Sequence, residues 1–168
     1  MAASQKGHLD VVRLLLWNGA TVDSRKDDGW TSLMLASHFG HLDVVRFLLE
    51  QGATIDSRRD DGWTSLMVAS QKGHLDVVRL LLENGAAVDS RKDDGWTSLM
   101  AASKNGHLDV VHLLLENGAT VDSRKDDGWT SLMAASQNGY LDVVRLLLQN
   151  GAAVHSHHNH NSTLSSGT

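Results

Sequence analysis

Apolar residues recur at helical spacing in two short blocks that follow each other along the chain. The second block, residues 74–83, is mostly Leu and Val, and its Asp76, Arg79 and Glu83 form one narrow polar stripe. A helix that is apolar around most of its circumference is buried on several sides. We therefore predict two short helices, 65–71 and 74–83, of which the second packs among several neighbours.

Turn and capping residues set the limits of both predicted helices. Thr64 is a favourable N-cap for the first helix, and Gly73 can adopt the left-handed conformation that ends it. Gly85 ends the second helix in the same way. An Asp-Gly pair precedes the first helix as a tight-turn signal, and residues 86–92 form an extended connection to the next turn.

This arrangement returns every 33 residues, which is the spacing from Trp30 to Trp63. The chain divides into a partial first unit and four further units: 1–26, 27–59, 60–92, 93–125 and 126–154. A unit of this size cannot bury its apolar helix faces alone, so neighbouring units must stack. We predict an all-α repeat solenoid of stacked helix-turn-helix units with projecting β-turn or hairpin loops.

Residues 1–154 resemble the ankyrin repeat family. The resemblance rests on the 33-residue period and on the string Asp-Gly-x-Thr-x-Leu-x-x-Ala, followed by Gly-His-Leu-Asp-Val-Val-x-x-Leu-Leu and Gly-Ala. It implies a scaffold without catalytic activity or cofactor. It also implies that another protein binds to the turn tips and to the concave face of the first helices.

The units depart from the family's Thr-Pro-Leu-His motif, which here reads Thr31-Ser32-Leu33-Met34 and its copies. Proline at the first helical position fixes the backbone in advance, and serine gives that up. Methionine offers apolar packing in place of the hydrogen bonds of histidine. We expect the fold to persist with less rigid turns.

Composition excludes several classes of function. The 168 residues include no Cys, which rules out disulfides, thiolate zinc sites and a cysteine nucleophile. A formal charge of −5 argues against a nucleic-acid-binding surface. No apolar run has the length of a membrane span, and the start lacks the pattern of a signal peptide. We expect a soluble cytoplasmic protein with no membrane insertion.

One tryptophan per full unit follows the turn glycine, at the edge of the expected binding face. These residues are Trp30, Trp63, Trp96 and Trp129. At the usual distance between packed helices, about 8–10 Å, the four indoles would form an aromatic ladder. Aromatic residues often anchor protein interfaces, but each indole could instead steady the neighbouring turn. Both interpretations stay open.

The most varied positions lie near the end of the first helix of each unit. The varied pairs that we propose as contacts are His38 with Phe39, Gln71 with Lys72, Lys104 with Asn105, and Gln137 with Asn138. The position before the motif's alanine also varies, with Leu35 and Val68 as the larger examples. Surface drift explains this variation as well as a binding role does.

Other conspicuous residues receive structural interpretations. The Arg/Lys and Asp pairs of the turns repeat as a ladder, whereas an enzyme needs one asymmetric constellation in a cleft, so we interpret them as solvated charge. The histidines that open the second helices are expected to be structural. Trp17 falls on the polar stripe and should be exposed.

The two ends of the array carry apolar helices where terminal repeats normally present polar faces. The chain begins at a Met that aligns with Met34, which suggests part of a longer array or a reading frame begun at an internal Met. Exposed ends predict fraying or end-to-end self-association. The tail at 155–168 is rich in His, Ser and Asn, and we expect it to be disordered, with at most adventitious zinc or nickel binding.

Two functions compete. The first is a non-enzymatic scaffold that binds a partner protein on its concave face. The alternative is a structural spacer within a longer array, or an engineered consensus-like array, without a specific partner, which the near-identity of the units favours.

Overall fold

Ten helices in five consecutive pairs make up residues 1–154, the part of the chain that this computed structural model describes. The helices are α1 (Ala2–Lys6), α2 (Leu9–Trp17), α3 (Ser32–His38), α4 (Leu42–Glu50), α5 (Ser65–Lys72), α6 (Leu75–Glu83), α7 (Ser98–Lys104), α8 (Leu108–Glu116), α9 (Ser131–Gln137) and α10 (Leu141–Gln149). The predicted disorder of the tail lies outside the described residues.

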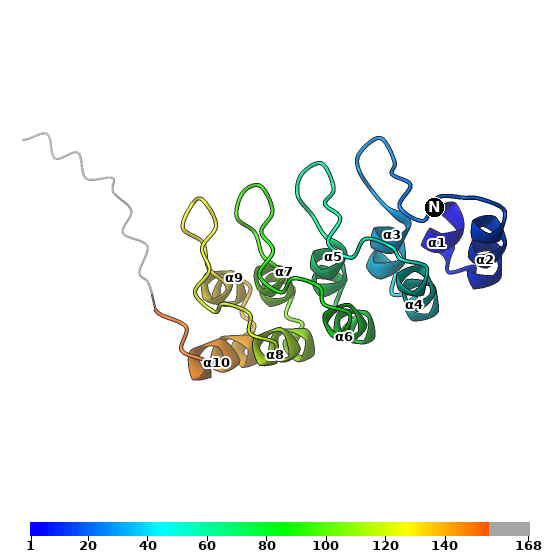
Figure 1. The fold of residues 1–168 in the computed structure, drawn as a ribbon. Helices are drawn as coiled ribbons and strands as arrows, with labels where there is room; N and C mark the ends of the chain where they lie inside the picture. Colours follow the sequence, from blue (N-terminus) through cyan, green and yellow to red (C-terminus); the bar gives the residue numbers. More distant parts are fainter. Residues whose placement is uncertain (155–168) are drawn as a thin grey trace, which may run out of the picture.

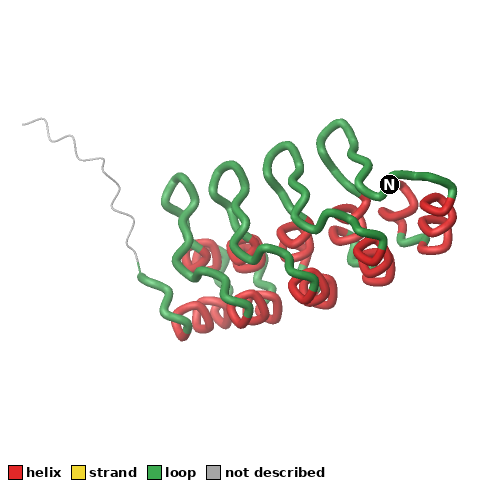
Figure 2. The backbone as a smooth tube through the Cα atoms, viewed as in Figure 1, coloured by secondary structure: helices red, strands yellow, loops and turns green. Residues whose placement is uncertain are grey.

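The pairs stack side by side, as the predicted solenoid requires (Figure 1). The odd-numbered first helices form one row and the even-numbered second helices form another. The four long loops project side by side, in the same direction, from the row of first helices (Figure 2). Residues from successive units are therefore placed in columns across the array.

Helix limits agree with the capping residues to within a residue. The Thr64 hydroxyl accepts a hydrogen bond from the Met67 backbone N–H at 3.3 Å, and α5 ends at Gly73 in the left-handed conformation with φ 75°. The second helix begins at Leu75, one residue later than predicted. Local sequence signals thus determine where each helix begins and ends.

The second helices and the inward side of the first helices form one continuous core. In the central unit Leu66 and Met67 of α5 are buried, as are Val77, Val78 and Leu81 of α6. Each fully buried side chain of this size stabilises the fold by about 1.5–3 kcal/mol. Because α5 packs against α3, α6 and α7 together, most of that burial depends on neighbouring units.

A column of histidines ties three of the second helices, α4, α6 and α8, to the preceding unit. His74 Nε2 lies 2.9 Å from the His38 carbonyl oxygen, and His41 and His107 make the same contact with Gln5 and Gln71. Each ring also lies against the glycine that ends the preceding unit's first helix. The structural interpretation of these histidines is confirmed.

The outer charges of the loops pair across units at the surface. Arg58 lies 3.2 Å from Asp93 and Arg25 lies 3.7 Å from Asp60, with both carboxylates about two-thirds exposed. Exposed pairs of this kind contribute about 0–1 kcal/mol each. For these residues the expectation of solvated, mutually offset charge is correct.

We predict that Gly73→Ala destabilises the array more than Gly139→Ala. Both glycines have a φ near 75°, where an L side chain costs about 1–2 kcal/mol. A Cβ on Gly73 would lie 2.5 Å from His107, whereas one on Gly139 would meet nothing within 4 Å. Urea unfolding should therefore show a larger loss of unfolding free energy for Gly73→Ala than for Gly139→Ala. Equal losses would contradict the close packing of the histidine column.

We predict that Ser65→Pro stabilises the protein by about 0.4–1 kcal/mol. Ser65 is the first residue of α5, where the N–H has no intrahelical partner, and its buried hydroxyl has no hydrogen-bond partner within the described residues. Thr64 already has the extended backbone that precedes proline, with φ −111° and ψ 168°. Thermal unfolding of Ser65→Pro should be compared with that of Ser65→Ala, which removes only the hydroxyl. A lower free energy of unfolding for proline than for alanine would contradict the prediction.

Candidate functional site

Each loop holds its own tryptophan at the point where the chain enters the first helix. In the fourth unit the Trp96 backbone N–H donates to Asp94 Oδ1 at 3.2 Å. The Trp96 carbonyl accepts from the Lys92 N–H at 2.8 Å. The corresponding bonds recur at Trp30 and Trp63. These bonds therefore fix the backbone from which each indole projects.

A basic side chain from the following loop lies over each of the first three loop indoles. Arg59 lies 5.0 Å from the ring centroid of Trp30, Lys92 lies 5.6 Å from that of Trp63, and Lys125 lies 5.7 Å from that of Trp96. Each of these three indoles thus contacts the following turn, as in the interpretation in which the indole steadies a neighbouring turn. The column alternates indole and cation, each contact contributing about 0.5–1 kcal/mol where exposed.

Carboxylates hold these cations in place. Lys125 Nζ lies 2.9 Å from Asp127 and 4.0 Å from Asp94, and Lys92 lies 3.5 Å from Asp94. The hydrogen bond from Lys125 lowers the pKa of the Asp127 carboxyl and raises the pKa of the lysine. The bond from Arg59 likewise lowers the pKa of Asp61. The Arg59–Asp61 and Lys125–Asp127 pairs therefore stay charged at neutral pH.

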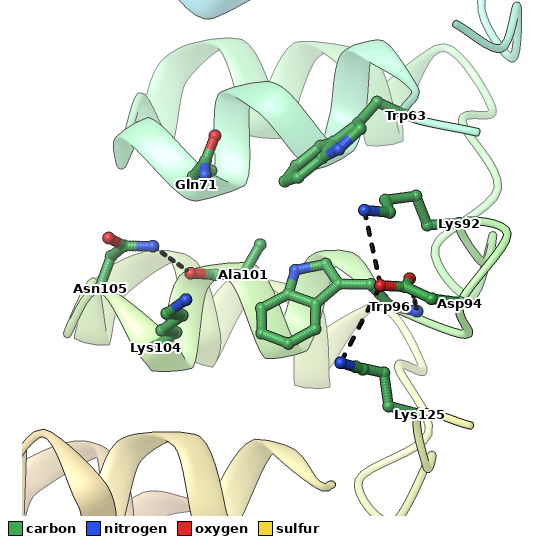
Figure 3. Close-up of a pocket in the computed structure, with 9 residues that line it drawn as sticks. All are labelled: Trp63, Gln71, Lys92, Asp94, Trp96, Ala101, Lys104, Asn105 and Lys125. Carbon is green, nitrogen blue, oxygen red and sulfur yellow. Dashed lines mark hydrogen bonds and ion pairs between the residues drawn. The ribbon is translucent and has the colours of Figure 1, made fainter. Parts of the chain in front are cut away.

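A hollow of about 240 Å³ opens between α5, α7 and the bases of their loops (Figure 3). It is lined by Trp63, Gln71, Lys92, Asp94, Trp96, Ala101, Lys104, Asn105 and Lys125. A second hollow of about 160 Å³ adjoins it, with Trp96, Lys104 and Lys125 lining both. We call this pair of cavities the Trp96 hollow, and we call the face formed by the first helices and the loop bases the inner face.

The Trp96 hollow brings together many of the residues proposed from sequence. Its lining includes Trp63, Gln71, Trp96, Lys104 and Asn105, and the second cavity adds Trp129 and Gln137. Sequence reasoning missed the four charged loop residues Lys92, Asp94, Lys125 and Asp127, because the turn charges were interpreted as solvated. Aligning each turn with the preceding unit would have placed these lysines beside its tryptophan.

A family model described as ankyrin repeats (3 copies) matches residues 1–92 and 84–158. The chain belongs to the ankyrin repeat family. Ankyrin repeats are generally protein–protein interaction modules, and the family is typically non-enzymatic. No curated protein matches the chain.

An aromatic cluster marks the N-terminal part of the ankyrin array's inner face. The His38 ring meets Trp30 edge-on at 5.5 Å and Phe39 at 4.8 Å, and Phe39 stacks near His41. Burial lowers the pKa of His38, and the positive charges of Lys72, His74 and Arg59 lower it further. Phe39 is 45% exposed, so the cluster offers apolar surface beside a neutral imidazole.

The remaining contact residues proposed from the sequence fall into a buried group and an exposed group. Leu35 and Val68 are buried at 5% and 3% exposure, which leaves little of either side chain for a partner. Lys72 and Asn138 are exposed, and the Asn138 side chain donates to the Ala134 carbonyl at 2.8 Å. Varied positions on the first helices are therefore a mixture of core and surface.

Trp17 is 73% exposed, as its place on the polar stripe predicts. Leu14 of α2 and Leu141 of α10 are also more than half exposed, in agreement with the apolar end faces expected from the sequence. End-to-end self-association through them stays a prediction.

Residues 1–154 hold no group of three His, Cys, Asp or Glu that could bind a metal ion. No helix among them is long and apolar enough to cross a membrane. The histidines His155, His157, His158 and His160 lie outside the described residues.

We predict that acid destabilises the array in part through His38. Its folded-state pKa lies below the unfolded value of about 6.5, so the unfolded chain binds the proton first and stability falls as the pH drops through 6.5. His38→Gln, which copies Gln71 of the next unit, should reduce the loss of unfolding free energy between about pH 7.5 and about pH 5. Urea unfolding at both pH values measures this loss of unfolding free energy. The unsubstituted chain is the comparison, and an unchanged pH dependence in His38→Gln would refute the prediction.

Proposed function

We propose that this protein is a non-enzymatic scaffold that binds a partner protein on the inner face, the concave face of an ankyrin array. One observation carries the proposal: exposed residues that differ between units collect with the loop tryptophans around the Trp96 hollow. The core positions of the second helices hardly differ between units. Variation is thus concentrated where a partner could use it.

The chemistry of the inner face suits protein recognition. Trp63 and Trp96 are partly exposed and held by their own loops, so a partner that contacts them finds them already ordered, which lowers the entropic cost of binding. The amide side chains of Gln71 and Gln137 supply donors and acceptors around them. Fixed aromatic anchors with a polar surround are typical of interface hot spots.

The spacer alternative rests on the near-identity of the units. The unit 60–92 differs from 93–125 at five positions, and two of these, Gln71/Lys104 and Lys72/Asn105, form the varied pair of the inner face. That asymmetry favours a binding role over a uniform spacer. Under the spacer hypothesis no partner depends on the inner face, and this difference can be tested.

We predict that Trp63→Ala together with Trp96→Ala abolishes capture of the partner from a lysate of the source organism. Loss of one aromatic anchor typically costs 2 kcal/mol or more, which is about thirtyfold in affinity. Proteins retained by the immobilised chain are identified by mass spectrometry, and the binding of the main one is then measured by calorimetry.

Trp17→Ala is the matched control, because this indole is exposed but does not line the Trp96 hollow. Far-ultraviolet circular dichroism should show that all variants keep their helical content. Equal capture by the double variant and by Trp17→Ala would refute the proposed binding face. Absence of any retained partner would favour the spacer hypothesis.

A further inference from the structure

Positive charge is concentrated in the Trp96 hollow, although the chain as a whole is acidic. The larger cavity is lined by three lysines and one aspartate, and the smaller cavity adds only one further charged residue, Asp127, whereas the complete sequence has a formal charge of −5. Lys92 pairs with Asp94, and Lys125 pairs with Asp127 and, at a longer distance, with Asp94. The carboxylates present therefore offset only part of the local positive charge.

Lys104 differs from the other two lysines. Its ammonium lies 5.5 Å from the ring centroid of Trp96, and it has no ion-pair partner among the described residues. It lines both cavities and is exposed. Lys92 and Lys125, by contrast, are about one-fifth exposed and paired. Lys104 is thus a cation positioned on an aromatic ring and available to a ligand.

This lysine also breaks the repeat. The corresponding positions in the other units are Gln5, His38, Gln71 and Gln137. Two ammonium groups, those of Lys104 and Lys125, therefore lie near the Trp96 ring, while a single cation lies over Trp63. The fourth unit consequently has a feature that a ligand could distinguish from the otherwise similar sites along the array.

We propose that the Trp96 hollow binds an acidic peptide segment of the partner, with an Asp or Glu carboxylate placed against Lys104. The proposal rests on the proposed function and specifies the chemistry of the partner. Trp63 and Trp96 contact the apolar parts of the segment. Gln71 offers its amide group to the segment's backbone, and Asn105, whose Nδ2 already donates to the Ala101 carbonyl at 2.8 Å, offers its side-chain oxygen. A nucleic acid fits less well, because polyanion binding requires many cations and the acidic chain would repel an extended polyanion.

The test uses the complete chain and a random peptide library displayed on phage. Peptides selected by the chain should be enriched in Asp and Glu, and their affinity should fall as salt concentration rises. Replacing the acidic residues of a selected peptide with Asn or Gln should weaken binding about three- to tenfold. Selection of neutral or basic peptides, or failure to select any, would overturn the proposal, as would equal binding of the amide version.

Variants of the chain locate the effect. Lys104→Gln, which copies the neighbouring units, should weaken binding of the selected peptide about two- to fivefold, and Lys104→Arg should retain affinity. Arg79→Gln on the exposed stripe of α6 removes the same charge elsewhere and should have no effect. A single-stranded oligothymidine that binds in place of the peptide would also overturn the proposal.

Two failures can be distinguished. If Trp96→Ala abolishes peptide binding while Lys104→Gln leaves it unchanged, the acidic-ligand inference fails and the proposed binding face stands. If neither substitution changes the binding of a selected peptide, the Trp96 hollow is not the site and the proposed function fails there as well.

Discussion

The dependence of each unit on its neighbours for burial determines the rest of this structure. The second helices carry Leu and Val around most of their circumference, and only a helix packed between two others can bury them. The same requirement fixes the register, since His74 must reach the His38 carbonyl of the preceding unit. A slip of the stacking would lose both the apolar contacts and this hydrogen bond.

A fixed register arranges polar and aromatic residues in columns as well. Each loop carries a basic residue and a tryptophan at equivalent positions. In the stack, the basic side chain of one loop therefore lies over the indole of the preceding loop. The alternation of indole and cation is therefore a consequence of stacking. It gives the inner face a preorganised amphipathic surface along its length, on which single substitutions create local differences.

The sequence predicts the helices and the stacking well, because Thr64, Gly73 and the spacing of apolar residues act locally or repeat at a fixed period. It predicts the inner face less well. The position of Lys92 over Trp63 depends on two residues 29 apart in the chain, which a local interpretation of the turn charges could not connect. The same limit applies to Val68, whose variability resembles that of a surface residue although the stacked helices bury it.

Uniform repeats pose a problem for specific recognition, because a ligand that fits one unit fits the next. Three of the loop indoles have the same kind of cation over them, so these contacts alone cannot select a position along the array. Selection requires a residue that breaks the period without disturbing the stacking. The end of the first helix meets both conditions, since its side chains reach the inner face while the helix is held by its core residues. Lys104 occupies such a position, and its charge is added where the loops have already ordered the neighbouring aromatic ring.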